Sequence, residues 1–515
     1  MNGAESLVRT LVAGGVEVCF ANPGTSEMHF VAALDRVEGM RCVLALFEGV
    51  VSGAADGYAR MADKPAATLL HLGPGLGNAL ANLHNAKKAA VPIVNIVGEH
   101  ATYHIDYDPP LAADIEGIAR PVSHWVKTSR DAKSVAADGA AAIAAARQPP
   151  GQIATLILPA DTAWNEGAGI APLPKIAAPA KVDDKAVHAA ADALRKGGKD
   201  AMLMLTGIAL REHGLLLAGK IAAATGCRIL AQWSNVRMAR GAGRVPILRL
   251  PYPVDAALNV LKDVKHLVLC GAREPIAFFA YPDKPSILTA PGCDIVTLAR
   301  LEQDLVDSLE RLVDALGARN AQANVQQPNV PASPTGAITL DKIAAALGAH
   351  LPEGAVVIDE SVTSGRGFAP LTAGAPPHDW ITNMGGSIGF STPVGVGAAI
   401  AVPDRKVICL TGDGSGFYTP QSLWTMAREN LDVTVVIFAN RSYAILKGEL
   451  AHVGAGNPGR KAMDMLTLDR PDPDWVALAR GFGVEASRAT DMDQFGAQFA
   501  AAMKQRGPRL IELVM

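Results

Sequence analysis

Two oxygen-bearing side chains, Asp413 and Asn440, each follow an apolar segment that has the composition of a buried strand, KVICLT at 406–411 and VTVVIFA at 433–439. The separation between them is that of one β-α-β crossover, so parallel pairing would put both strand ends at one edge of a sheet. A carboxylate, an amide oxygen and a nearby main-chain oxygen are ligands that magnesium accepts while it shares phosphate oxygens. The stretch therefore predicts a metal and diphosphate site, although a lone Gly-Asp-Gly is more often an ordinary tight turn.

The turn after the first of these segments is rich in glycine. Gly412 and Gly414 allow a sharp bend that brings backbone N–H groups toward phosphate oxygens, and Ser415 adds a hydroxyl group. Thr419 and Pro420 have the pattern of a helix N-cap followed by a first helical residue. We expect a helix to start there, just beyond the turn.

A carboxylate in the first third of the chain is a candidate for proton transfer. Glu48 directly follows the apolar segment CVLALF at 42–47 and precedes an alanine- and glycine-rich helix. A carboxylate at the mouth of an apolar strand is poorly solvated, so it can hold or share a proton near neutral pH. The alternative is that Glu48 only satisfies the N–H groups of the first helical turn.

His71 lies at the end of the next apolar segment, and we expect a glycine-rich loop at 73–78 and a helix from Asn78 to follow it. Strand ends line the ligand crevice of parallel sheets, so His71 could serve as an acid or base. A lone histidine in a strand is more often a hydrogen-bonded core residue. The turn at 22–27, which contains Thr25, is a third strand end of the same predicted sheet, and it could equally be a plain helix cap.

The composition excludes several classes of protein. The chain has 515 residues and a formal net charge of −3, so it lacks the basic surplus that nucleic acid or anionic membranes would require. The six cysteines are scattered without a Cys-x-x-Cys pair, which favours reduced thiols in a cytoplasmic protein. No apolar run approaches the roughly 20 residues that span a bilayer, and the N-terminus lacks the pattern of a signal peptide. We expect a cytoplasmic protein that acts on a small molecule.

Strand and helix patterns alternate along the chain, which predicts an α/β fold of three consecutive doubly wound parallel-sheet domains. Two segments rich in proline, alanine or polar residues, 166–184 and 317–336, read as linkers. The predicted domains are 1–165, 185–316 and 337–515. No Gly-x-Gly-x-x-Gly opens a helix in the middle block, so a nicotinamide site has little support.

Taken together, three motifs resemble the thiamine diphosphate-dependent decarboxylase and acetolactate synthase superfamily. They are the Gly-Asp-Gly-Ser turn with Asn440, Glu48 with the segment GAADGYAR, and the segment GPGLGN. The resemblance spans essentially the whole chain and implies, in order, a pyrimidine-binding, a central and a diphosphate-binding domain. It implies thiamine diphosphate and Mg²⁺ as cofactors and a homo-oligomer, at least a dimer and usually a tetramer. FAD is not expected, because the FAD signature of acetolactate synthases is absent.

The resemblance assigns roles to individual residues. Asp413, Asn440 and the main-chain oxygen of Ser442 would bind magnesium, and Tyr443 fits the aromatic residue that closes the motif. Ala439 stands where the family usually has another Asn, a departure that leaves the metal ligand itself in place. The implied cofactor-binding residues are Thr363, Gly386, Ile388, Gly412, Asp413, Gly414, Ser415, Asn440, Ser442 and Tyr443.

Within that set, Ile388 matches the bulky residue that bends the cofactor, and the Gly386 carbonyl would accept from its amino group. Glu48 would protonate the aminopyrimidine ring, which implies decarboxylation of a 2-keto acid through an ylid and an enamine. Glu48 and His71 are the implied catalytic residues.

The branch with the greatest similarity is that of benzoylformate decarboxylase. His71 matches an active-site histidine of that branch, and Thr25, His71 and Ile445 would contact the substrate. The branch's second histidine should fall near Phe278 but is missing, and Glu449 puts a carboxylate where an aromatic pocket wall is expected. The alternatives are a carboligase or lyase of the acetolactate synthase kind, or a non-catalytic binding subunit with this fold.

Overall fold

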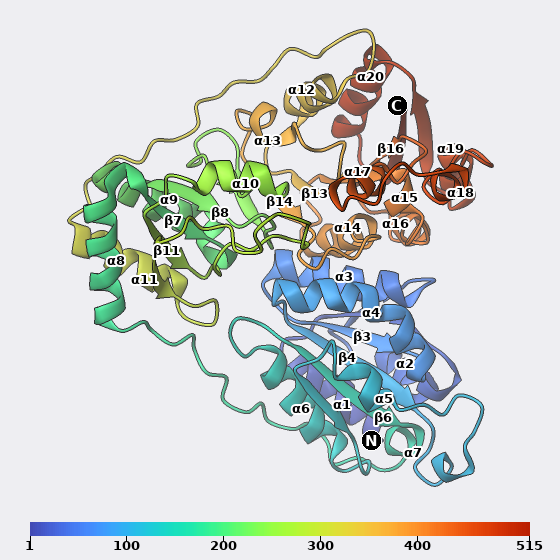
Figure 1. Cartoon of the computed structure of the whole chain (residues 1–515). Helices are drawn as coiled ribbons and strands as arrows, with labels where there is room; N and C mark the ends of the chain where they lie inside the picture. Colours follow the sequence, from blue (N-terminus) through green and yellow to red (C-terminus); the bar gives the residue numbers. More distant parts are fainter.

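The computed structural model describes residues 1–515, and its strands form three sheets. In Figure 1 the N-terminus lies at the bottom and the C-terminus at the upper right. The first sheet is parallel throughout. Its strands are, in spatial order, β2 (Arg41–Leu44), β1 (Val18–Asn22), β3 (Ala66–Leu70), β4 (Ile93–Glu99), β6 (Ile153–Pro159) and β5 (Trp125–Thr128).

Helices cover both faces of the first sheet, as alternation of strands and helices requires. One buried apolar cluster lies between the sheet and helices α3 (Glu48–Ala62) and α4 (Leu72–Ala89). A separate cluster lies on the opposite face, against α1 (Gly3–Ala13), α2 (Met28–Arg36) and α6 (Val135–Ala146).

The second sheet is also parallel and has helices on both faces. Its strands are, in spatial order, β10 (Leu248–Arg249), β8 (Arg228–Ala231), β7 (Ala201–Leu205), β11 (His266–Cys270) and β12 (Asp294–Ala299). The helices that pack on it are α8 (Asp184–Gly197), α9 (Glu212–Thr225), α10 (Val254–Leu261) and α11 (Leu305–Leu316).

The third sheet is mixed. Its strands are, in spatial order, β17 (Glu485–Ala489), β18 (Arg509–Val514), β16 (Val433–Ala439), β15 (Val407–Gly412), β13 (Val356–Glu360), β14 (His378–Thr382) and β9 (Met238–Arg240). Strand β9 comes from the middle of the chain and pairs antiparallel with β14, whereas the other pairs are parallel. Helices α12 (Leu340–His350), α14 (Ser391–Ala401), α16 (Ser422–Arg428) and α20 (Met492–Lys504) pack around this sheet.

The structure confirms the predicted α/β fold of consecutive sheets, while the domain limits 1–165, 185–316 and 337–515 stay a prediction. Two local predictions are wrong. Residues 73–78 are not a loop, because α4 already begins at Leu72. The helix predicted just beyond Thr419 and Pro420 is present as α16, which begins at Ser422, but Thr419 is not its N-cap, because its Oγ1 atom donates to the Gly389 carbonyl at 3.1 Å.

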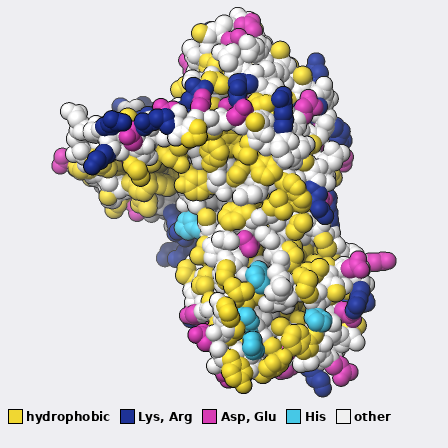
Figure 2. Space-filling model, turned by 90° about the vertical axis from the view of Figure 1, so that its right-hand side faces the viewer, with side chains coloured by type: hydrophobic (Ala, Val, Ile, Leu, Met, Phe, Trp, Pro, Cys, Tyr) yellow, Lys and Arg dark blue, Asp and Glu magenta, His cyan; other side chains and the backbone are white.

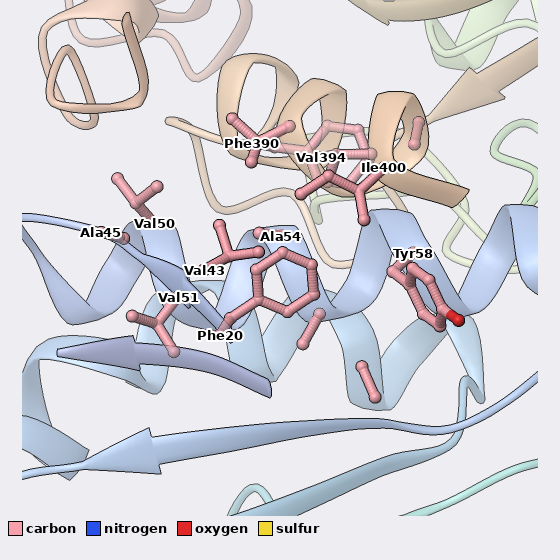
Figure 3. Packing of buried hydrophobic residues seen from close by; sticks show 14 of the residues in the cluster. Phe20, Val43, Ala45, Val50, Val51, Ala54, Tyr58, Phe390, Val394 and Ile400 are labelled. Atoms are coloured by element: carbon pink, nitrogen blue, oxygen red, sulfur yellow. The ribbon is translucent and has the colours of Figure 1, made fainter. Parts of the chain in front are cut away.

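Helices α3 and α14 cross at very short distance and join the first sheet to the third (Figure 3). A Cβ atom at Gly57 would lie 2.0 Å from the Val394 carbonyl oxygen, and one at Gly397 would lie 1.8 Å from the Ala54 carbonyl oxygen. Around this crossing, apolar side chains of the two helices pack together. Those on the α14 side are Val394, Ile400 and Phe390, the residue before α14, and those on the α3 side are Val50, Ala54 and Tyr58. Only glycine allows the two backbones to approach so closely.

A buried ion pair reinforces the same junction. Arg60 of α3 pairs with Asp56 at 2.7 Å, and both side chains are fully buried. The Arg60 guanidinium also donates to the Thr382 carbonyl at 3.0 Å and to the Val236 carbonyl at 3.3 Å. These bonds satisfy a buried cation and tie α3 to the end of β14 and to the segment that leads into β9.

No helix of the chain combines the length and the apolar character that crossing a membrane requires.

The crossing predicts a position-specific sensitivity to added volume. We expect Gly397→Ala to lower the free energy of unfolding by about 1–3 kcal/mol, because its methyl group would overlap a backbone carbonyl that cannot turn away. The matched control is Gly77→Ala in α4, where a Cβ atom has nothing within 4 Å and the change favours the helix. Thermal melts of both variants check the prediction, and equal melting temperatures for the two would contradict it.

Candidate active site

Glu48 is the first residue of α3 and is buried. Its Oε2 atom accepts a hydrogen bond from Nδ2 of Asn78 at 2.9 Å. A Cβ atom at Gly75 would lie 3.0 Å from Glu48 Oε1, so the glycine leaves room for the carboxylate. The carboxylate is therefore held in one orientation by an amide from α4. Sequence reasoning did not single out Asn78, although it is the last residue of the quoted GPGLGN segment.

His71 lies one residue beyond β3 and is partly exposed, so it reaches the edge of the sheet as expected. Its Nδ1 atom is 2.9 Å from Oε2 of Glu27, which also accepts from the Gly24 N–H at 2.7 Å. Burial raises the pKa of the Glu27 carboxyl, and the charge and hydrogen bond of His71 lower it again in part. A Cβ atom at Gly24 would lie 2.1 Å from His71 Nδ1, so glycine is required where the ring packs. Thr25 begins the following 3-10 turn, η1 (Thr25–Glu27), and is exposed.

Sequence reasoning missed Glu27, although the residue belongs to the turn at 22–27 that was singled out. It also assigned no role to His100, which follows β4 at the same edge of the sheet. Nε2 of His100 is buried without a hydrogen-bond partner. Burial lowers the pKa of His100, with further contributions from the charges of His104 and His71. Figure 2 shows histidine side chains among hydrophobic ones on the lower part of one face, over the first sheet.

Asp413 and Asn440 lie at the ends of adjacent strands, which confirms the predicted side-by-side arrangement. In the register of β15 and β16, Gly412 is opposite Phe438. Asp413 is 2% exposed, and its Oδ1 and Oδ2 atoms accept from the N–H groups of Gly414 at 2.8 Å and Arg441 at 2.5 Å. Burial raises the pKa of this carboxyl, and those hydrogen bonds oppose the shift.

The carboxylate of Asp413 has no basic side chain as partner. The guanidinium of neighbouring Arg441 turns away and pairs with Asp472 at 2.7 Å. Oδ1 of Asn440 accepts from the Ser442 N–H at 2.9 Å, which keeps the amide oxygen beside the turn. A buried anion next to amide and main-chain oxygens is a donor set that suits a hard divalent cation.

The loop that follows Asn440 is fixed from two sides. Ser442 Oγ and the Tyr443 N–H both donate to the Leu466 carbonyl, each at 3.0 Å. A Cβ atom at Gly414 would lie 2.6 Å from Cε1 of Tyr443, so the ring packs directly on the turn. Ser415 is buried in that turn. Tyr443 precedes α17 (Ala444–His452), on which Ile445 is half-buried.

Gly386 and Ile388 lie in the loop between β14 and α14. Gly386 has φ +81°, a left-handed conformation that favours glycine. Nδ2 of Asn82 in α4 donates both to the Gly49 carbonyl at 2.9 Å and to the Gly389 carbonyl at 3.1 Å. One buried amide therefore bridges the residue after Glu48 and the residue after Ile388. Sequence reasoning did not identify Asn82.

Glu360 at the end of β13 fixes the start of α14. Its carboxylate accepts from the Phe390 N–H at 3.0 Å and from the Ser391 N–H at 2.9 Å. Burial raises the pKa of Glu360 to about 7, although these hydrogen bonds oppose the shift. Thr363 lies in the turn three residues later and is half-buried. Sequence reasoning missed Glu360 because nothing local in the segment DESVTSG marks its carboxylate as a helix cap.

The predicted residues thus form two groups. Glu48 and His71 lie at the carboxyl edge of the first sheet, whereas Asp413, Asn440 and Ser442 lie at that of the third. No hydrogen bond or ion pair within the chain joins one group to the other. The roles assigned to these residues stay predictions.

Comparison with known proteins points to one family. Residues 1–130 match the family described as "Thiamine pyrophosphate enzyme, N-terminal TPP binding domain", and residues 364–513 match its "C-terminal TPP binding domain" counterpart. The chain is 52% identical, over 100% of its length and 99% of the other protein, to the "Putative acetolactate synthase large subunit IlvX" of Mycobacterium tuberculosis. It is 27% identical to benzoylformate decarboxylase of Pseudomonas aeruginosa, with 97% of this chain and 96% of that protein covered.

A solved structure has the same fold. The thiamine diphosphate-dependent 4-hydroxybenzoylformate decarboxylase of Rhodococcus jostii superposes with a TM-score of 0.87 at 23% identity, over 99% of this chain and 98% of that one. The predicted resemblance is therefore confirmed for the superfamily, and benzoylformate decarboxylase is among the relatives.

Glu360 predicts a pH dependence of stability. The folded chain keeps this proton at pH values where the unfolded chain has released it, so stability falls as pH rises from about 4.5 to about 7. Since one pKa unit corresponds to about 1.4 kcal/mol, the loss approaches about 3 kcal/mol. Glu360→Gln keeps a neutral side chain at every pH, so its melting temperature should rise relative to the native chain between pH 5 and pH 8. A constant difference in calorimetric melting temperature across that range would contradict the assignment.

Proposed function

The chain belongs to the thiamine diphosphate-dependent decarboxylase and acetolactate synthase family, and from this premise we propose that it decarboxylates a 2-keto acid with the help of thiamine diphosphate and Mg²⁺. The observation that carries the proposal is the pairing of His71 with the buried Glu27, beside the buried and oriented carboxylate of Glu48. A proton-transfer histidine and a proton-holding carboxylate at one sheet edge are what such a reaction needs from the protein.

The residues at the third sheet fit a metal and a diphosphate group. Asp413 is a buried carboxylate without a basic partner, and Asn440 and the Ser442 carbonyl add neutral oxygens beside it. We propose that these three ligate Mg²⁺ and that Gly412, Gly414, Ser415 and Thr363 surround the diphosphate. Gly386 and Ile388 would hold the rings of the cofactor, and Tyr443 would support the turn at Gly414 on which its ring packs.

When bound, thiamine diphosphate supplies the electron sink for the carbon–carbon bond that breaks as carbon dioxide leaves. The chain's own residues handle protons and position. Asn78 donates to Oε2 of Glu48 and so orients the carboxylate, whose oxygens would exchange a proton with the bound cofactor. Glu27 accepts from Nδ1 of His71, so Nε2 of that ring is the atom free to take or deliver a proton at the substrate.

We further propose that a complete site needs two copies of the chain. In this arrangement the group around Glu48 and His71 from one copy would face the group around Asp413 from the other. The support is that the two groups make no hydrogen bond or ion pair within one chain. Such a site requires at least two identical subunits. We propose an assembly of four subunits in the cytoplasm.

The second candidate function is carboligation, in which the site joins two carbonyl carbons. It is supported by the 52% identity to a protein whose name is that of an acetolactate synthase large subunit. His71 favours decarboxylation, because a positioned proton donor ends the reaction by protonation. Incubation with pyruvate distinguishes the two: acetolactate indicates carboligation and acetaldehyde indicates decarboxylation.

His71→Ala tests the proton-transfer role. We expect kcat for carbon dioxide release from the best acid of a 2-keto acid panel to fall by about 100-fold or more. Thiamine diphosphate affinity, measured by calorimetric titration, should stay within threefold. His188→Ala, an exposed histidine on the second sheet's α8, is the control and should keep full activity. A large loss of cofactor affinity in His71→Ala would make the residue structural, and no turnover of any acid by the native chain would refute decarboxylation.

Asp413→Ala tests the metal assignment through binding rather than activity. Removal of the buried carboxylate should abolish the Mg²⁺ dependence of thiamine diphosphate binding and weaken that binding by about 100-fold or more, since one charged ligand of a small site is lost. Asp404→Ala, an exposed carboxylate just before β15, should bind normally. Unchanged magnesium-dependent binding by Asp413→Ala would disprove the assignment.

A further inference from the structure

A group of aromatic rings lies against Gly386, the glycine proposed to hold the cofactor. The ring of Phe278 is so close that a Cβ atom at Gly386 would lie 2.9 Å from its Cζ atom. Around Phe278, the ring centroid of Trp233 lies at 4.9 Å, that of Tyr252 at 5.4 Å and that of Phe279 at 4.6 Å. All four rings come from segments that follow strands of the second sheet: Trp233 follows β8, Tyr252 follows β10, and Phe278 and Phe279 follow β11.

The wall of this aromatic group holds one carboxylate, that of Glu449. Glu449 belongs to α17 and lies four residues after Ile445, so both side chains are on one face of the helix. Burial raises the pKa of both Tyr252 and Tyr281, and the nearby charge of Glu449 raises it further. The ring of Tyr281 also contacts His452 of α17, with centroids 6.0 Å apart.

The Glu449 carboxylate is only partly satisfied. Its side chain is 17% exposed, and its Oε1 atom is buried without a hydrogen-bond partner. No lysine or arginine forms an ion pair with it. The nearby Nδ1 atom of His452 lies 3.5 Å from Oε1, but that ring is 60% exposed and is cationic only when it is protonated. An unpaired carboxylate that is mostly buried is costly unless a partner arrives from outside the chain.

We infer that the site beside these rings takes a 2-keto acid whose side chain ends in a cation, a guanidinium or an ammonium group, and that this cation pairs with Glu449. This inference rests on the proposed function and names its substrate class. The keto-acid end would lie toward Gly386 and the charged end toward Glu449. Aromatic faces and a carboxylate both attract cations, and together they do so more strongly than either alone.

The same wall disfavours uncharged substrates. A substrate with an apolar side chain would leave the Glu449 oxygen unpaired and would displace the water that can reach it. Sites built around a buried polar group reject analogues that lack the matching group much more strongly than they reject a change in size. Glu449, rather than the aromatic rings, is therefore the specificity-determining residue of this pocket.

The experiment compares two pairs of ligands on the enzyme loaded with thiamine diphosphate and Mg²⁺. The reactive pair is 5-guanidino-2-oxopentanoate and 2-oxohexanoate, and the unreactive pair is 5-guanidinopentanoate and hexanoate. We expect kcat/KM to be at least tenfold higher for the guanidino acid and calorimetric Kd to be at least tenfold lower for its unreactive analogue. Glu449→Gln should remove both preferences, because the guanidino compounds lose their ionic partner and 2-oxohexanoate no longer leaves a buried charge unpaired.

Glu353→Gln, an exposed carboxylate between α12 and β13, is the matched control and should keep both preferences. The inference is overturned if the native enzyme prefers the neutral member of each pair, if neither unreactive analogue binds, or if Glu449→Gln keeps the preference for the guanidino compounds. Selective binding of the guanidino compounds without turnover of any 2-keto acid would support the inference and refute the proposed decarboxylation, so the two failures are distinguishable. Melting temperatures of both variants verify that they fold.

Discussion

The close crossing of α3 and α14 is the contact on which the rest of the arrangement depends. Gly57 and Gly397 let two backbones approach to a distance that a single methyl group on either helix would prevent. The N-terminal residue of α3 is Glu48, and the loop with Gly386 and Ile388 leads into α14. The crossing therefore fixes how the first and third sheets of one chain sit relative to each other, and with them the two half-sites that each chain contributes. Asn82, Arg60 and Glu360 then secure the junction with buried hydrogen bonds.

In our proposal the residues at the two sheet edges have different chemical roles. At the third sheet, Asp413 and Asn440 present oxygen atoms whose geometry is set by backbone N–H groups, a fixed arrangement suited to anchoring a charged cofactor. At the first sheet, Glu48 and His71 are each oriented by one side chain, Asn78 and Glu27. Their environments differ, since Glu48 is buried and His71 is partly exposed. In our proposal the anchoring half serves any substrate of the family, and selection of the substrate falls to the pocket wall that Glu449 and the aromatic rings form.

The sequence predicts well what local chemistry determines. Apolar segments gave the strands, and the adjacency of Asp413 and Asn440 followed from the spacing of one crossover, which the register of β15 and β16 confirms. It predicts poorly what depends on contacts between distant segments. Glu27 became visible as a partner of His71 only once the first turn and β3 lay side by side, and Glu360 caps a helix that starts 31 residues later. Strand β9 was not predicted, because a three-residue edge strand is too short to show an alternating pattern. The start of α4 was predicted six residues too far along the chain, because the glycines at 73, 75 and 77 are typical of a loop.

In our proposal, one working site combines the Glu48 half of one chain with the Asp413 half of another. Complementation between inactive chains measures this directly. Glu48→Gln and Asp413→Ala chains, each inactive alone, would be co-expressed with different affinity tags, and the doubly purified hybrids would be assayed for carbon dioxide release from a 2-keto acid. We expect the hybrids to recover about a quarter to a half of the native activity, because one of the two sites of each mixed pair contains only native residues. Hybrids as inactive as their parents would show that each chain builds its site alone and would contradict the account.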